Sequence, residues 1–470
     1  MGSTPGAASG ATLPPGLDPA ASPFLDLAAD PGASRPARLG ALRELVSVLP
    51  SQRRGGSAVP PPTGEVNNHV HTIYSFSPHT PAMAAWRARE AGLAAAGSVD
   101  HDSIGAAEEM LEASAILGIG STVGFELRVS LLDSPFATRK INNPDSAGIA
   151  YMTIQGLPRR AIPEAMAFLK PISEARGERN RKMTAAVSSM LSSAGYGTLE
   201  YQRDVLPLSK AAEGGSVTER HILTAAAAAF IAAHGRGPAL IEGIAKNFGI
   251  AAPSKVASWL ADPTNPHYLY DLLGLLKSGF LDRVFIQPGA DECIPARKAI
   301  DFARRVGAIP AYAYLGDIAD SPTGDKKAER FEDAFLDELI PYLGELGFQA
   351  IAYMPPRNTR AQIEGLRALM ARNGLMEISG VDINSPRQSF NCPEVLDPAM
   401  SRLLDATWAL IAHEKLSGLD PKYGIFSPLN PLANKQLTER IDLYAQAGRS
   451  IDPCRPEDPT LLARLAANWS

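Results

Sequence analysis

Cysteine is scarce in this chain, and the few cysteines present are not paired in the sequence. Cys293, Cys392 and Cys454 are an odd number among 470 residues and stand far apart. Disulfide scaffolds carry dense, even-numbered cysteines, and structural zinc sites carry closely spaced pairs. The sequence therefore predicts neither a disulfide framework nor a cysteine-based zinc site. It favours a reducing cytoplasm.

Long hydrophobic runs and an excess of basic residues are also missing. The most apolar stretch, 225–233, is too short to cross a bilayer. The first 23 residues lack the basic start and apolar core of a secretory signal. The net charge is -5 and the pI is about 6.0, whereas nucleic-acid-binding proteins usually carry a basic surplus. We expect neither a membrane nor a nucleic acid as partner.

What the chain does have is an alternation of strand-like and helix-like segments. Short apolar runs such as 122–130 alternate with segments of helical periodicity such as 359–374, and a further strand is expected at 284–288. This alternation is typical of an α/β protein with a parallel sheet, open or closed. The expected division is a flexible leader with one short helix at 1–63, a first α/β part at 64–173, a helical insertion at 174–279, a second α/β part at 280–445 and a C-terminal tail at 446–470.

The sharpest local signal is the run NNHVHTIYSFSPH at 67–79. In a strand, His69 and His71 share one face because side chains alternate with a period of two. Two imidazoles near the C-terminal end of a strand can bind one cation at the mouth of a barrel. His79 follows in the next loop as a further candidate ligand. A lone histidine would more often be structural, but the pair favours metal binding.

Two further signals follow the next strand-like runs. The sequence SVDHDS places Asp100, His101 and Asp102 at the end of a small-residue strand, where loops carry function in α/β folds. Alternatively, Asp102 or Ser103 caps a helix while His101 binds metal. The run VGFE ends at Glu126, which either bridges two cations or is an ordinary surface glutamate.

The last signal is GVDINSPRQSFNCP at 380–393. Asp382 and Asn384 have the spacing of residues on one strand face. Arg387 follows in a loop, where its guanidinium could bind an oxyanion through two hydrogen bonds. The alternative for Arg387 is an ordinary surface arginine.

Together, HVHT, DHD, GFE and VDIN resemble the motifs of the PHP (polymerase and histidinol phosphatase) family of metal-dependent phosphoesterases. The resemblance covers about 65–155 and 280–400. It implies a distorted (β/α)7 TIM-like barrel with one to three divalent ions, Zn, Mn or Fe, at its C-terminal end. By resemblance, one site would comprise His69, His71, Glu126 and Asp382, with Asn384 beside them, and a second site would comprise His101 and His79, with Glu126 bridging.

The chain departs from the family pattern at several positions where histidines are usual. Tyr151 stands after the GFE strand, Tyr312 and Tyr314 stand on a later strand, and Asn384 ends the VDIN motif. Neutral tyrosine and asparagine are weaker ligands than histidine. The resemblance therefore implies fewer metals, or oxygen ligands that favour Fe, Mn or Mg over Zn.

Other polar residues have simpler interpretations. We expect Thr218 to cap a helix and His221 to be structural, although His221 could also belong to a lid over the mouth. His234 has the position of a histidine at a helix end. Arg139 and Lys140 could face an anion or a solvated turn, and Cys392 is expected to pack.

The leading functional hypothesis is hydrolysis of a phosphoester in a small, anionic metabolite by metal-activated water. In this hypothesis His101 or Asp102 assists proton transfer, and Arg387 binds phosphate. Two alternatives stay open. The same site could cut an amide or lactone, or the chain could be a non-catalytic module of the PHP type that binds a ligand.

Overall fold

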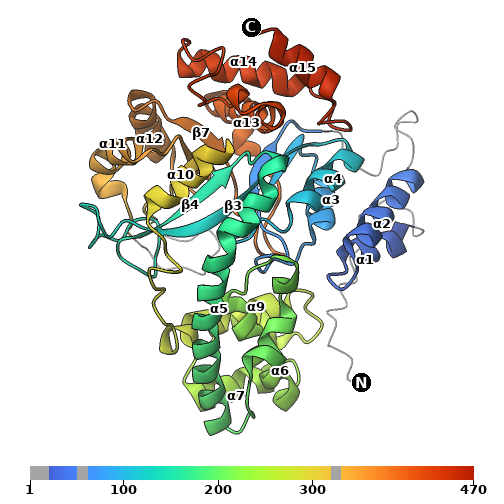
Figure 1. Cartoon of the computed structure of the whole chain (residues 1–470). Coiled ribbons are helices and arrows are strands. Elements are labelled where there is room, and N and C mark those ends of the chain that lie inside the picture. Colours follow the sequence, from blue (N-terminus) through green and yellow to red (C-terminus); the bar gives the residue numbers. More distant parts are fainter. Residues whose placement is uncertain (1–20, 50–61, 319–329, 470) are drawn as a thin grey trace.

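A computed structural model describes residues 21–49, 62–318 and 330–469 (Figure 1). Its centre is one seven-stranded sheet in which the strands lie side by side in chain order. An isolated bridge joins Val70 to Ile383, just beyond the last strand, and brings the two edges together. The strands are β1 (Val66–Val70), β2 (Ala95–His101), β3 (Gly120–Ser130), β4 (Ile149–Gln155), β5 (Ile309–Ala313), β6 (Ala350–Tyr353) and β7 (Met376–Ser379). The expected α/β, TIM-like barrel is confirmed as a nearly closed barrel.

One strand runs against the expected direction. β4 is antiparallel to both β3 and β5, whereas the other neighbouring strands are parallel. The segment 131–148 between β3 and β4 contains no helix, and a parallel connection would need a crossover of a dozen or more residues, usually a helix. The reversal brings the start of β4, with Tyr151, to the barrel end at which β3 finishes.

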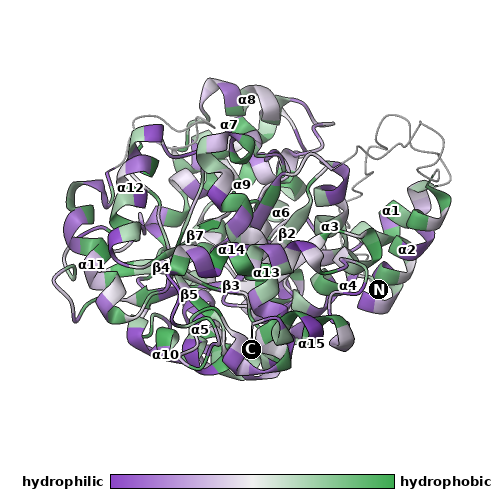
Figure 2. Cartoon of the chain, turned by 90° about the horizontal axis from the view of Figure 1, so that it is seen from above, coloured by the Kyte–Doolittle hydropathy of each residue, from purple (hydrophilic) through white to green (hydrophobic). Residues whose placement is uncertain are grey.

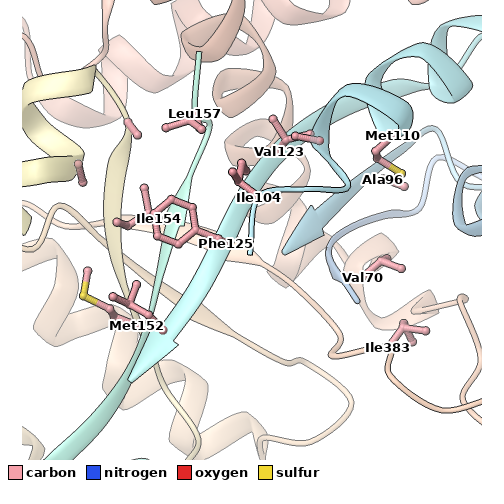
Figure 3. Packing of buried hydrophobic residues seen from close by; sticks show 14 of the residues in the cluster. Val70, Ala96, Ile104, Met110, Val123, Phe125, Met152, Ile154, Leu157 and Ile383 are labelled. Atoms are coloured by element: carbon pink, nitrogen blue, oxygen red, sulfur yellow. The ribbon is translucent and has the colours of Figure 1, made fainter. Parts of the chain in front are cut away.

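The strands alternate between an outer and an inner face. On β3, Val123, Phe125 and Leu127 pack among the hydrophobic residues of the surrounding helices, as Figure 3 shows for Phe125 and Val123. Thr122 and Glu126 take the other face, in keeping with the period of two. The surrounding helices α11 and α12 show both hydrophilic and hydrophobic residues (Figure 2). The helices of the barrel are α3 (Pro81–Glu90), α4 (Ala107–Leu117), α10 (Ala296–Val306), α11 (Leu336–Leu346) and α12 (Arg360–Arg372).

A helical hairpin, α1 (Ser22–Ala29) and α2 (Arg35–Val48), packs beside α3 and α4 (Figure 1). The expected short helix is α2, but α1 lies within the stretch expected to be a flexible leader. Two interactions hold the hairpin: Arg38 forms a buried ion pair with Glu109 at 2.6 Å, and Thr80 donates a hydrogen bond to the carbonyl of Ala28 at 2.6 Å. The segment 22–29 is therefore helical and packed, where a flexible leader was expected.

The helical insertion forms a layer of its own below the barrel in Figure 1. Its hydrophobic core is separate from that of the barrel and includes Leu191, Phe230 and Leu276. The segment 284–288, expected to be a strand, is not one, because Arg179 binds the carbonyl of Ile286 at 3.1 Å and no strand pairs with it. The helices of this layer are α5 (Ile162–Ser193), α6 (Glu219–His234), α7 (Pro238–Phe248), α8 (Ser254–Ala261) and α9 (Tyr268–Gly279).

Three C-terminal helices cover the opposite end of the barrel: α13 (Ser401–Leu419), α14 (Leu437–Ser450) and α15 (Pro459–Ala467). Ile411 of α13 packs against Val66 and Ala95, at the starts of two strands. The expected C-terminal tail is thus largely helical, with Leu462 buried. Within the described residues, every helix is too short or too polar to span a bilayer.

Candidate metal centre

Three ligand atoms meet where the end of β1 lies near the middle of β3. The Nε2 atom of His69 lies 3.2 Å from Nε2 of His71. Oε2 of Glu126 lies 3.7 Å from the first of these nitrogens and 3.8 Å from the second. All three side chains are buried, and their ligand atoms lie within 4.8 Å of one another.

These separations suit one cation. Around a tetrahedral zinc ion with bonds of about 2.1 Å, neighbouring ligand atoms lie roughly 3.4 Å apart. Two imidazole nitrogens that face each other at 3.2 Å can share at most one proton, so a metal ion satisfies both lone pairs. The donor set of two histidines and a carboxylate thus fits a divalent ion.

Glu126 is ionised in this setting. Burial alone would raise its pKa, but hydrogen bonds and charge from His101 and His69 outweigh burial and hold the pKa well below the usual range. The carboxylate is therefore available as a ligand without the loss of a proton.

Asp382 and Asn384 lie beside the three ligands. Oδ1 of Asp382 lies 3.2 Å from Nε2 of His71, and Asn384 donates its amide to the same oxygen at 2.8 Å. Burial opposes ionisation of Asp382, yet the adjacent histidines, His71 foremost, keep its pKa well below the usual range. The amide nitrogen of Asn384 faces Asp382, so its role in this structure is to orient that carboxylate.

A short chain of hydrogen bonds positions His71. Ser75 donates its hydroxyl hydrogen to Oδ1 of Asp100 at 2.5 Å, and Nδ1 of His71 lies 3.3 Å from the same hydroxyl. Because the hydroxyl hydrogen is used, Ser75 offers His71 a lone pair, which favours a proton on Nδ1 and leaves Nε2 free for metal. Thr72 also binds Asp100, through its backbone N–H and its hydroxyl, both at 2.7 Å.

His101 faces Glu126 across two parallel strands. These residues are partners in the register of β2 and β3, and Nδ1 of His101 lies 2.9 Å from Oε2 of Glu126. The Tyr151 ring stands 6.0 Å from the His101 ring. Burial raises the pKa of Tyr151, so its hydroxyl stays neutral. His101 thus contacts the candidate ligand Glu126, and Tyr151 lies next to the His101 ring.

Asp102 is held by the insertion. Its backbone has a φ of +50°, and its carboxylate is bound by Arg176 of α5. It caps no helix, because α4 begins five residues later, with Ala106 at its N-cap and no side-chain cap. From this ion pair a buried network of alternating charge joins the barrel to the insertion, through Arg176, Glu219, Arg179, Glu292 and Arg128.

His79 and Arg387 have other neighbours. The ring of His79 lies 5.3 Å from the ring of Phe390, and burial lowers its pKa to about 4. Arg387 donates two hydrogen bonds to the carboxylate of Asp271 in α9, at 2.8 and 2.7 Å, and its guanidinium lies over the Trp259 ring. A ligand role for His79 and a phosphate-binding role for Arg387 remain predictions, but the structure uses the guanidinium to hold the insertion.

Tyr312 of β5 and Tyr314, just after it, point away from the metal ligands. Ile309 and Ala311 of β5 belong to the inner cluster with α13, so Tyr312 takes the outer face. Tyr312 donates to Glu332 at 3.1 Å, and Tyr314 donates to Asp333 at 2.6 Å. Neither hydroxyl is therefore placed as a substitute for a histidine ligand.

The remaining polar candidates contact other protein groups. The backbone N–H of Thr218 donates to Nδ1 of His221 at 2.9 Å in a capping box, which confirms the capping expectation. Arg139 lies over the ring of Phe335, and Cys392 is buried. His234 is the last residue of α6 and lies 2.8 Å from the hydroxyl of Tyr196.

A cavity of about 800 Å³, including its solvent-filled mouth, lies between the barrel end and the insertion. His71 and His101 line it from the barrel, and Arg220 lines it from α6. The described part of the chain has two residues other than glycine with positive φ, Phe76 and Asp102, and both line this cavity. Backbone strain of this kind concentrates at functional sites.

Sequence analysis did not identify several of these residues. Arg220 and Arg176 lie in a helical stretch where arginines are common. Phe76 lies in a loop in which the histidines were the candidate metal ligands, and a phenylalanine is not a ligand. The one available signal was the polar run before α6, since helix starts often face a ligand.

The chain matches no family model, and no curated protein is similar to it by sequence. Among solved structures, an amidohydrolase from Chromobacterium violaceum, with sulfate bound and no metal, is 19% identical over 69% of this chain and 89% of that chain, with a TM-score of 0.43. A protein from Bifidobacterium adolescentis named as a metal-dependent phosphoesterase is 18% identical over 73% of this chain and 98% of that chain, with a TM-score of 0.45. Because both similarities are weak, the function proposed below rests on the residues of this chain.

Proposed function

We propose that this protein is a metal-dependent hydrolase that cleaves a phosphate ester of a small molecule. The observation that carries this proposal is the convergence of His69, His71 and Glu126 within 4.8 Å, beside a cavity that Arg220 also lines.

The ligand atoms of His69, His71 and Glu126 would hold the ion, with Asp382 next to them. When bound, a divalent ion lowers the pKa of water and polarises a phosphoryl oxygen, which supplies the nucleophile and the electrophile of hydrolysis. Ser75 and Asp100 favour the tautomer of His71 whose Nε2 lone pair can bind the metal ion.

His101 is the proposed proton acceptor. If its Nδ1–H donates to Glu126, the other ring nitrogen carries a lone pair, and His101 lines the cavity with a partly exposed side chain. The oxygen of water forms a bond to phosphorus as the ester P–O bond breaks. The proton of the water passes to His101, which then protonates the leaving alkoxide. Asp102 is less suited to this step because Arg176 already binds its carboxylate.

Arg220 is the proposed receptor for the phosphate charge. Its guanidinium lies 3.3 Å from both the backbone and the side-chain oxygen of Asn384, and these acceptors are neutral. The neighbouring carboxylate of Glu219 is bound by Arg176 and Arg179. The positive charge of Arg220 is thus not neutralised by these contacts, whereas that of Arg387 is matched by Asp271.

The test is phosphate release from a panel of phosphate monoesters and diesters, with the protein loaded in turn with Zn²⁺, Mn²⁺ and Fe²⁺. We expect turnover that a chelator abolishes and that the same ion restores. Glu126→Gln should abolish it, whereas Glu345→Gln, in α11 and outside the cavity lining, should not. Hydrolysis of amides or lactones with no phosphate release would instead support the non-phosphate alternative.

A further inference from the structure

Four apolar side chains of one hydrophobic cluster line the cavity. Phe76, from the loop after β1, lines it together with Leu223 of α6, and Leu281 and Phe285 follow from the segment after α9. These four side chains, here called the apolar wall, line the same cavity as His71 and His101. Because they come from both the barrel and the insertion, the wall exists only when the two are docked.

Phe76 is fixed in place on this wall. Its backbone has a φ of +77°, a conformation that residues with a side chain rarely adopt. Its ring packs edge-on against His221 at 4.8 Å and lies 5.7 Å from the ring of Tyr270. The strained backbone holds the ring of Phe76 at the cavity, and this ring offers only apolar surface.

The two rings that pack against Phe76 are uncharged. Burial lowers the pKa of His221 to about 3, so its imidazole is neutral. Charged residues line the same cavity. Asp145 and Lys277 are exposed, and the ion-paired Asp102, Arg128, Arg176 and Glu219 line it together with Arg220. The cavity therefore combines charged and metal-binding groups with a cluster of apolar side chains.

We propose that the apolar wall binds the leaving group of the substrate, and that the protein selects phosphate esters whose alcohol is aromatic or otherwise rich in hydrocarbon. This inference rests on the proposed phosphoesterase function. A polyol such as glycerol would leave its hydroxyls facing Phe76, Leu223 and Leu281 without hydrogen-bond partners. An aromatic ring would bury apolar surface there and stack on or against Phe76.

The test compares two phosphonates that cannot be hydrolysed. Binding of phenylphosphonate and methylphosphonate to the Mn²⁺-loaded protein is measured by calorimetry. We expect phenylphosphonate to bind about tenfold tighter or more, from the apolar area of the ring. Phe76→Ala and Leu281→Ala should each reduce this ratio at least about threefold. Leu208→Ala, a change at an exposed leucine of the insertion, should leave it unchanged.

The outcomes separate this inference from the proposed function. Equal binding of the two phosphonates, or a ratio that Phe76→Ala and Leu281→Ala both leave intact, would overturn the apolar wall even if phosphate esters are hydrolysed. A phenyl preference that both variants reduce would support the wall even if no ester is hydrolysed. Using two variants from different elements guards against misfolding of one of them, because Phe76 lies in a barrel loop and Leu281 follows α9.

Discussion

Nδ1 of His101 lies 2.9 Å from Oε2 of Glu126, the same oxygen that faces the Nε2 atoms of His69 and His71. One carboxylate oxygen therefore connects a candidate proton acceptor with a candidate metal site. The connection depends on strand register, since His101 and Glu126 are direct partners in the parallel pair β2–β3. A one-residue slip of either strand would move one of them to the outer face.

His101→Asn tests the proton-transfer role. The amide of asparagine can still donate to Glu126 but cannot accept a proton near neutral pH. We expect kcat to fall about 10²- to 10⁴-fold while bound metal stays unchanged. A variant that loses its metal would identify His101 as a ligand instead, and one that keeps its kcat would remove it from the mechanism.

Ser75→Ala tests the support of His71. Without the hydroxyl, Nδ1 of His71 loses the partner at 3.3 Å that favours the metal-binding tautomer. We expect metal affinity to fall about 10- to 100-fold, measured by competition with a chromogenic chelator. Ser77→Ala, two residues along the same loop, is the matched control because its hydroxyl contacts the backbone N–H of His79 instead. Equal affinity in wild type and Ser75→Ala would contradict the assignment.

Arg220→Met and Arg387→Met separate phosphate binding from docking of the insertion. Hydrogen bonds to charged groups contribute about 1.5–3 kcal/mol, so Arg220→Met should raise KM for a phosphate ester about 10- to 100-fold. Arg387→Met should lower the melting temperature, because it leaves Asp271 buried without its cation. It should raise KM less than Arg220→Met does. A larger rise of KM in Arg387→Met than in Arg220→Met would restore the role expected from the sequence.

Glu332→Gln tests a pH-dependent contribution to stability outside the site. Burial raises the pKa of Glu332 to about 7, so the folded protein binds a proton there that the unfolded chain releases near pH 4.5. The unfolding free energy of the wild type should therefore fall between about pH 4.5 and pH 7 by about 3 kcal/mol from this group. Glutamine does not titrate, so the variant should become more stable relative to the wild type as pH rises through this window.

Urea unfolding at pH 5 and pH 8 measures this difference. Glu338→Gln, at an exposed position of α11, is the control and should show no pH-dependent difference from the wild type. A stability difference between Glu332→Gln and the wild type that is the same at both pH values would contradict the raised pKa.

Much of the metal centre could be predicted from the sequence. His69, His71 and Asp382 were identified because each lies at or just after the end of a strand, and such ends meet at one mouth of a barrel. Glu126 was identified at the end of the run VGFE, although β3 continues to Ser130. The reversal of β4 also left a trace, since 131–148 has no helical pattern. The general alternation of strands and helices nevertheless favoured a parallel sheet.

Two features could not be predicted from the sequence: which face of a strand is the inner one, and how the insertion packs on the barrel. Tyr312 and Tyr314 looked like ligand positions because a short buried strand gives no sign of which face is inner. Arg387 looked exposed because its partner, Asp271, is 116 residues away on an inserted helix. Arg220 and Phe76 meet at one cavity only through the same docking of insertion and barrel. Pairings of this kind are properties of the assembled fold rather than of local pattern.

The most direct test of the account is the metal content of purified protein, determined by elemental analysis after loading with one divalent ion and removal of the excess. The account predicts about one equivalent or more in the wild type and almost none in His69→Ala and Glu126→Ala. His267→Ala, a change in the insertion away from the cluster, should match the wild type, and circular dichroism should show all variants folded. Full occupancy in both His69→Ala and Glu126→Ala would contradict the assignment of the metal centre.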